Sequence, residues 1–130
     1  MDTTSQIAPG EFLLRRGDAP AVVMAGSGET RTFAQLDDRS TRLARVFDEA
    51  GLVPGDHVAV LLHNELAYAD AVWAALRSGL FVTPINWHLG SAEAGYIVED
   101  CGATALVTSA AMSDVVGDFI VPPGGNTMDT

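Results

Sequence analysis

The hydrophobic positions of this chain follow two kinds of pattern. Across 33–47, apolar side chains and one serine recur at three- and four-residue steps, which predicts an amphipathic helix. Thr32 and Gln35 have the spacing of a capping box at its start, and Gly51 predicts its end. The segment 57–62 is instead mostly apolar on both faces, which is typical of a strand inside a parallel sheet.

Strand and helix patterns alternate along the rest of the chain. We expect strands at 21–25, 80–85 and 104–108, and helices at 11–16, 65–78, 92–101 and 109–116. Asn64 and Ser91 stand where helix caps are preferred, and Pro84 predicts an edge position or a strand end. This order predicts consecutive βαβ units in a mostly parallel α/β sheet with flanking helices, preceded by a β-hairpin.

The stretch Gly26–Gly28, which follows the first strand, has two interpretations. A strand followed by Gly-x-Gly begins many dinucleotide-binding loops, which would make the chain an independent nucleotide-binding domain. That fingerprint requires a third glycine, where this chain has Arg31, and a helix that starts at the loop, whereas the helix signal begins at Thr32. A hairpin turn with a short return strand fits better, because glycine supplies the positive φ that such turns need.

Composition and charge narrow the classes of function. With 130 residues, of which 48% are hydrophobic, the chain suits one folded domain, and no apolar run reaches the ~18 residues of a membrane span. The start of the chain lacks the basic and apolar stretches of a signal peptide, so we expect a cytoplasmic protein. A net charge of −10 disfavours nucleic acid and anionic lipid as partners.

Several reaction types are disfavoured by the residues present. All seven Lys and Arg positions are arginines. The chain therefore has no lysine to act as a Schiff base, a general base or a phosphate clamp. The single cysteine, Cys101, precedes a glycine at a predicted helix end and is expected to be structural. His57 and His63 are too far apart along one strand to share a metal ion, and we expect Asp37 and Asp38 to face solvent.

Polar residues follow two of the predicted strands at the same edge of the sheet. His63 and Asn64 come after one strand, and Asn86, Trp87 and His88 come after the next. Ligands of open α/β sheets usually bind at this edge, so Asn64, Asn86 and His88 are candidate ligand-binding residues. The alternatives are a helix cap and a surface imidazole for the first pair, and core packing or a domain contact for Trp87.

Several segments together resemble the N-terminal part of AMP-forming acyl-CoA synthetases, which belong to the adenylate-forming, or AMP-binding, enzyme family. The landmarks are Thr32-Phe33 with Leu36-Asp37, "LVPGDHVAV" from Leu52, "WAALRSG" from Trp73, "PINWHL" from Pro84 and "YIVEDCGA" from Tyr96. The resemblance covers about residues 11–109, and "INWHL" looks most like the fatty-acid and medium-chain branch. The family fold, a hairpin before the first long helix and then βα units, agrees with the pattern above.

The resemblance implies a reaction, and it also identifies catalytic motifs of that reaction that this chain lacks. Members of the family adenylate a carboxylic acid with ATP and Mg²⁺ and then transfer the acyl group to CoA. They use a Ser/Thr/Gly-rich loop that ends in Pro-Lys-Gly and a lysine of a small C-terminal domain. No position here matches those motifs, so we assign no catalytic residue, no metal ligand and no cofactor to this chain alone. Two positions depart from the family, His88 where many relatives have arginine and Gly90 where threonine or proline is usual.

We therefore expect a truncated N-terminal fragment of a fatty-acid–CoA ligase-like enzyme that is inactive alone. Residues 1–10 are expected to be a flexible arm, 11–116 the AMP-binding-enzyme domain, and 117–130 a divergent, disordered tail. The alternative is a non-catalytic module that pairs with itself or with a chain carrying the rest of the synthetase, because truncation would expose an apolar patch.

Overall fold

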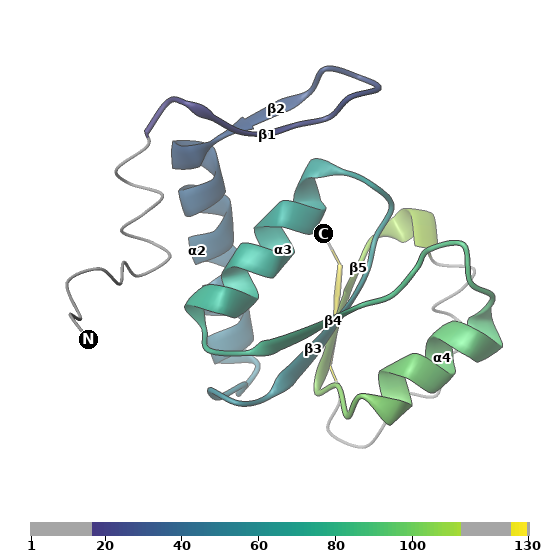
Figure 1. The fold of residues 1–130 in the computed structure, drawn as a ribbon. Coiled ribbons are helices and arrows are strands. Elements are labelled where there is room, and N and C mark those ends of the chain that lie inside the picture. The colour runs from purple at the N-terminus through teal and green to yellow at the C-terminus, as the bar shows by residue number, and fades with distance from the viewer. Residues whose placement is uncertain (1–16, 113–125, 130) are drawn as a thin grey trace, which may run out of the picture.

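The computed structural model describes residues 17–112 and 126–129, which form two sheets flanked by helices (Figure 1). Strands β1 (Pro20–Val23) and β2 (Thr30–Thr32) form an antiparallel hairpin. Strands β3 (His57–Leu61), β4 (Phe81–Pro84), β5 (Ala105–Thr108) and β6 (Asn126–Asp129) form a parallel sheet in the order β4-β3-β5-β6. The helical elements of this part are α2 (Phe33–Glu49), α3 (Leu66–Arg77), α4 (Ser91–Asp100) and the 3₁₀ turn η2 (Ala110–Met112). The predicted fold, a hairpin followed by a parallel α/β sheet, is confirmed.

The hairpin turn accounts for the glycines that resemble a nucleotide loop. Gly28 has a φ of +75°, a conformation that favours glycine, and its N–H donates to the Met24 carbonyl at 2.8 Å. The Met24 N–H donates in turn to the Glu29 carbonyl at 2.8 Å, which closes the turn. Helix α2 begins only at Phe33, so this loop lacks the helix N-terminus that a dinucleotide fingerprint requires. The hairpin interpretation is confirmed.

Helix α2 begins where the pattern predicts. The Thr32 hydroxyl accepts from the Gln35 N–H at 3.1 Å, and the Thr32 N–H donates to Gln35 Oε1 at 2.9 Å, so the predicted capping box is present. Leu36 and Phe47 are each 1% exposed and face the core from one side of the helix. Burial of each of these side chains contributes about 1.5–3 kcal/mol of hydrophobic free energy.

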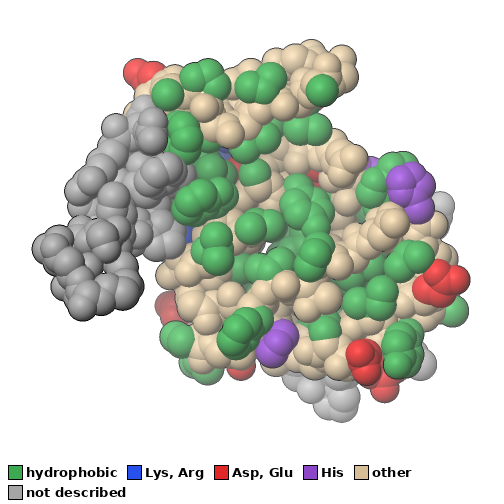
Figure 2. All heavy atoms as spheres, viewed as in Figure 1, with side chains coloured by type: hydrophobic (Ala, Val, Ile, Leu, Met, Phe, Trp, Pro, Cys, Tyr) green, Lys and Arg blue, Asp and Glu red, His purple; other side chains and the backbone are tan. Residues whose placement is uncertain are grey.

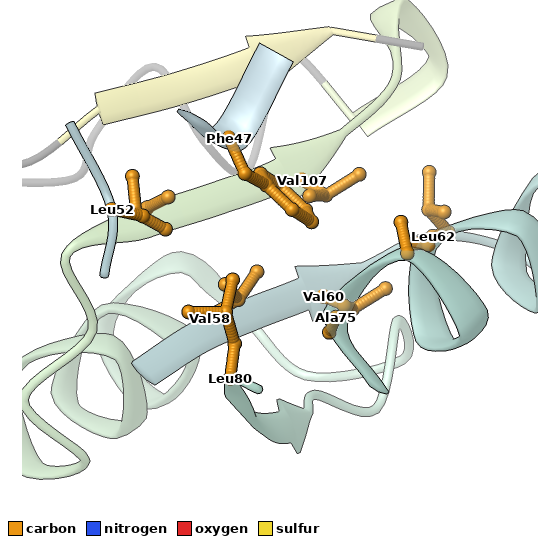
Figure 3. Packing of buried hydrophobic residues seen from close by; sticks show 11 residues of the cluster. Phe47, Leu52, Val58, Val60, Leu62, Ala75, Leu80 and Val107 are labelled. Carbon is orange, nitrogen blue, oxygen red and sulfur yellow. The ribbon is translucent and has the colours of Figure 1, made fainter. Parts of the chain in front are cut away.

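Helices cover both faces of the parallel sheet. Because β4 and β5 lie on opposite sides of β3, right-handed crossovers place α3 on one face and α4 on the other (Figure 1). On the α2–α3 face, Figure 3 shows side chains pointing toward one another from helix and sheet, among them Phe47, Val58, Val60, Ala75 and Val107. The opposite face packs on α4 through Ala59, Leu61, Ala94, Val98 and Leu106. Successive residues of β3 thus alternate between the two layers.

Two ion pairs join the hairpin and α2 to α3. The Arg31 guanidinium donates to both carboxylate oxygens of Asp70, with Nη2 at 2.7 Å from Oδ2, and the two side chains are 12% and 9% exposed. Arg77 Nη1 donates to Asp37 Oδ1 at 2.6 Å. The prediction that Asp37 faces solvent is therefore wrong, because α3 packs over it, whereas Asp38 is exposed as predicted.

The caps of two helices differ from the prediction. Glu65, rather than Asn64, is the N-cap residue of α3, and no side chain caps this helix. Gly90 is the N-cap residue of α4, and Ser91 is the first residue of the helix rather than its cap. Both helices are stabilised by the burial of their apolar faces, which makes a side-chain cap less necessary.

The two outer strands of the parallel sheet, β4 and β6, compare differently with what the sequence predicts. Strand β4 ends at Pro84 on an outer edge, as predicted, and proline offers no N–H to a further strand. At the other edge, β6 pairs with β5 in the segment for which a disordered tail is predicted. The predicted arm at 1–10 and helix at 11–16 lie outside the described residues, and of the helix predicted at 109–116 only η2 is described.

Candidate functional site

The carboxyl edge of the parallel sheet forms a crevice between the loops that follow β3 and β4. These strands are neighbours, and the chain leaves β3 toward α3 on one face but leaves β4 toward α4 on the other (Figure 1). Diverging connections of this kind leave the hollow in which open α/β sheets bind ligands. The structure brings Asn64, Asn86 and His88 together in this crevice, as the sequence predicts.

The crevice has a volume of about 440 Å³, an apolar floor and a polar rim. It is lined by Leu62, Asn64, Tyr68, Pro84, Ile85, Asn86, Trp87 and His88. Leu62 and Ile85 are buried, whereas the three candidate residues are exposed. The volume falls within the range of small-molecule sites, roughly 300–1,000 Å³. The crevice therefore has the size and the mixed lining of a ligand site.

Asn86 holds the ring of His88 in a defined orientation. The His88 backbone N–H donates to Asn86 Oδ1 at 2.9 Å, and His88 Nδ1 lies 3.0 Å from the same oxygen. A backbone N–H can only donate, so the shared atom is the amide oxygen, and Nδ1 must carry a proton to bond with it. When the imidazole is neutral, Nε2 is then the nitrogen that can accept a hydrogen bond from a ligand.

Trp87 contacts two imidazole rings. Its ring centroid lies 3.6 Å from that of His88 in a stacked arrangement and 4.5 Å from that of His63 in an edge-on arrangement. Figure 2 shows histidine beside hydrophobic side chains on the side of the molecule that carries the β4–α4 loop. Trp87 also packs against the core on the α4 side of the sheet, so it both belongs to the core and lines the crevice.

Tyr68 also lines the crevice, although no sequence pattern indicated it. It lies in the first turn of α3, and no spacing rule linked it to Asn64, because Asn64 precedes the helix. Burial raises the pKa of the Tyr68 phenol, so the hydroxyl stays protonated at neutral pH. The site therefore offers a neutral hydroxyl beside two amides and an imidazole.

The residues described in the lining of the crevice are all without a carboxylate, so they do not provide the oxygen ligands that Mg²⁺ prefers. The same described residues include no guanidinium or ammonium group, so they do not provide a clamp for a triphosphate. Across residues 17–112 and 126–129, no cluster of three or more His, Cys, Asp or Glu could hold a metal ion.

The other residues considered from the sequence lie elsewhere. His57 is the first residue of β3, at the amino ends of the parallel strands, and its ring stacks on that of Phe81 with centroids 5.0 Å apart. The structure therefore separates His57 from His63. Cys101 is half-buried at the end of α4, where its thiol donates to the Val98 carbonyl at 3.5 Å. None of the helices in the described part combines the length and hydropathy needed to span a membrane. The cytoplasmic location stays a prediction.

Three polar groups near the carboxyl edge lack hydrogen-bond partners. Thr108, at the end of β5, is 5% exposed, and its Oγ1 is buried without a partner. The same holds for Ser109 Oγ and Glu65 Oε1. Leaving such a group unsatisfied costs about 1–3 kcal/mol. No sequence pattern indicated these groups, because their burial arises from tertiary packing rather than from local spacing.

The fold and the crevice define a doubly wound α/β domain with its candidate ligand site at the topological switch point. The chain belongs to the AMP-binding enzyme family, whose family model matches residues 11–123. This match confirms the resemblance given by landmarks such as "LVPGDHVAV" and "PINWHL", and it extends past residue 109, where the resemblance was expected to end.

Two relatives with known activities are ligases of fatty acids by name. The chain is 35% identical over 104 residues to a fatty acid–[acyl-carrier-protein] ligase of Streptomyces coeruleorubidus, covering 80% of this chain and 20% of that protein. It is 36% identical over 95 residues to a long-chain-fatty-acid–CoA ligase of Yersinia pestis, covering 72% of this chain and 16% of that protein. The chain thus spans a fifth or less of the length of these relatives.

Solved structures show the same fold in the same part of longer enzymes. The N-terminal domain of FACL13 from Mycobacterium tuberculosis superposes with a TM-score of 0.77 at 25% identity, covering 96% of this chain and 34% of that one. A fatty acyl CoA synthetase of Mycobacterium tuberculosis superposes with a TM-score of 0.76 at 24% identity, covering 100% and 27%. The fold described above is therefore that of an N-terminal part of adenylate-forming enzymes.

Proposed function

We propose that this chain supplies the N-terminal part of an ATP-dependent ligase for carboxylic acids of the fatty-acid class, and that it does not activate an acid by itself. Membership of the AMP-binding enzyme family and the two fatty-acid ligases among its relatives support the reaction class. Activation of an acid by ATP requires groups that stabilise charge on the phosphates. The sequence contains no lysine for this purpose, and the crevice contains no arginine.

Within this function, the crevice holds the adenine ring that ATP and CoA share. The single observation that carries this assignment is a lining of aromatic rings and neutral polar groups without a formal charge. An asparagine amide can bond adenine through a donor and an acceptor together, and bases stack on aromatic rings. Asn86 Oδ1 is engaged with His88, so Asn64 is the amide that faces the ligand.

Fluorescence titration of Trp87 tests the adenine assignment. In a Trp73→Phe background, adenosine, AMP and CoA are expected to change the emission with similar dissociation constants of about 1 mM, since only the base is bound. Asn64→Ala is expected to weaken all three about tenfold, because it removes two hydrogen bonds. Uridine is the matched control. The assignment is wrong if no adenine compound alters the emission, or if uridine does so equally.

A pyrophosphate-exchange assay tests the proposed inactivity separately. The purified chain is incubated with ATP, Mg²⁺, labelled pyrophosphate and a mixture of fatty acids. We expect no exchange above the background of a sample without acid. Exchange that depends on the fatty acid would contradict this part of the proposal but would leave the family assignment unchanged.

A second candidate function is that of a non-catalytic module that pairs with itself or with a chain carrying the rest of a synthetase. Large apolar side chains at Val53, Leu76 and Phe81 are 58%, 51% and 60% exposed, which favours a covering partner. Light scattering of the purified chain is expected to show concentration-dependent association that Phe81→Ser reduces. A monodisperse monomer at all concentrations would exclude pairing with itself.

A further inference from the structure

A second hollow lies between α2 and α3. It has a volume of about 230 Å³ and is lined by Arg39, Arg42, Leu43, Val46, Ala67 and Asp70. Four of these residues come from α2 and two from α3. It shares no lining residue with the crevice, so it is a different site from the one assigned to the ligand. We call it the α2–α3 groove.

Positive charge is concentrated on the α2 side of this groove. Arg39, Arg42 and Arg45 are exposed along α2, whereas the other two arginines of the described residues, Arg31 and Arg77, are partly buried in ion pairs with aspartates. The chain as a whole has a net charge of −10. An acidic partner is therefore repelled by the surface in general and attracted to this stripe.

The floor of the groove is apolar and accessible. Leu43 and Ala67 are half-buried, and Val46 is 42% exposed. Figure 2 shows hydrophobic side chains gathered over the α2–α3 region. The groove is smaller than the roughly 300 Å³ at which drug-sized sites begin, which favours the side chains of a partner protein over a small molecule. An apolar anchor surrounded by charge pairs is the usual centre of a protein interface.

We propose that the α2–α3 groove is a docking site for an acidic, amphipathic helix of a partner protein. Apolar side chains one turn apart on that helix pack on Leu43 and Val46, and flanking carboxylates pair with Arg39 and Arg42. An anionic membrane is disfavoured, because the hollow is concave and the rest of the chain is acidic. This inference does not depend on the ligase activity.

The charges already present at the groove permit this pairing. Arg42 contacts Asp38 at 3.2 Å, but the two side chains are 73% and 59% exposed, and ion pairs at this exposure are exchanged at little cost. Asp70 lies in the wall, and both of its carboxylate oxygens accept hydrogen bonds from Arg31. The Asp70 carboxylate is thus already compensated and does not exclude an acidic partner.

Binding of a designed peptide to the full chain tests the proposal. The probe is a fluorescein-labelled, 18-residue helical peptide with leucines at i, i+3, i+4 and i+7 and glutamates on the flanking positions. The control peptide carries lysine in place of every glutamate. We expect the acidic peptide to bind with a dissociation constant of about 0.1 mM at low salt, weakening as salt rises, and the lysine peptide not to bind.

Substitutions in the protein distinguish the groove from general attraction. Arg39→Glu, Arg42→Glu and Val46→Asp are each expected to weaken the acidic peptide about tenfold. The matched controls are Arg45→Glu, on the same helix but outside the groove, and Val53→Asp, at a similarly exposed valine elsewhere. Arg45→Glu is expected to weaken the peptide only about threefold, because it removes charge from the same stripe without a contact in the groove, and Val53→Asp less than about twofold. Urea unfolding of each variant establishes that it is folded.

Three results would overturn the proposal. The first is no binding of the acidic peptide up to about ten times the expected dissociation constant. The second is an equal loss in the Arg45→Glu and Arg39→Glu variants, which would show attraction to α2 without a groove. The third is binding of phosphatidylglycerol vesicles that Arg39→Glu abolishes while the peptide does not bind, which would assign the groove to a lipid surface.

Discussion

The loops that follow β1 and β4 differ in what the chain does after them. After β1 the chain turns back at Gly26–Gly28 into β2, and backbone hydrogen bonds at 2.8 Å close the hairpin. After β4 it crosses to the opposite face of a parallel sheet and leaves a crevice of about 440 Å³ lined by Asn86 and His88. The glycine-rich turn thus has no helix N-terminus behind it, whereas the diverging helices leave a crevice at the β4 loop.

The two loops also differ in what holds them. The hairpin is anchored to α3 by Arg31, which donates to Asp70 in a largely buried pair. The β4 loop is held by hydrogen bonds of Asn86 and by ring contacts of Trp87, and much of it is exposed. We therefore expect substitutions at the hairpin anchor to affect folding, and substitutions in the β4 loop to affect ligand binding.

Arg31→Ala is expected to have the largest effect on stability. It leaves the Asp70 carboxylate, 9% exposed, without its counter-charge and hydrogen-bond donor. The free energy of unfolding should fall by about 3 kcal/mol, which urea unfolding followed by circular dichroism measures. The double substitution Arg31→Met, Asp70→Leu should recover most of this loss. A loss below about 1 kcal/mol would show that the hairpin is anchored by other contacts.

Gly28→Ala is expected to have the next largest effect, with Gly26→Ala as its control. Gly28 has a φ of +75°, so a Cβ strains the backbone and should lower the free energy of unfolding by about 1–2 kcal/mol. Gly26 has no positive φ and no heavy atom within 4 Å of an added Cβ, so its substitution should change stability by less than about 0.5 kcal/mol. Equal effects at both positions would contradict the hairpin geometry.

Asn86→Ala is expected to alter the site with little change in folding. Without the amide oxygen, the Nδ1–H of His88 loses its acceptor, and the ring is free to take the other tautomer. Nitrogen NMR of the imidazole should show protonation on Nδ1 in the wild type and a mixture in the variant. Adenosine binding should weaken severalfold, whereas the unfolding free energy should fall by about 1 kcal/mol at most. An unchanged tautomer would show that Asn86 does not orient the ring.

The smallest expected effect is a shift in the titration of Asp70. Burial raises the pKa of this carboxyl above its ordinary value of 3.8, and the hydrogen bonds and charge of Arg31 oppose that rise. The folded state then binds the proton more tightly than the unfolded state, so the contribution of Asp70 to stability falls as pH rises from 3.8 to its folded pKa. Carbon NMR titration should find the pKa above 3.8, and higher still in Arg31→Ala. A value at or below 3.8 would contradict the burial argument.

Local patterns predicted elements whose stabilising contacts are close in sequence. Thr32 and Gln35 of the capping box are three positions apart, and the apolar composition of the strand predicted at 57–62 is sufficient to indicate that it is buried. The prediction that Asn64 and Ser91 cap the helices α3 and α4 was wrong. The pattern contains polar residues at plausible positions, but packing against the sheet selects where each buried helix begins.

The sequence by itself determined the α/β order, the hairpin, the family and the edge of the sheet at which the candidate residues Asn64, Asn86 and His88 gather. Each of these follows from short spacings or from landmarks along the chain. Only the tertiary structure decided that Tyr68 joins Asn64 and Asn86, and that Arg31 and Arg77 neutralise aspartates 39 and 40 residues away. The physical reason is that such contacts depend on how α3 packs against α2 and the sheet, and this packing is set by the whole apolar core rather than by any local pattern.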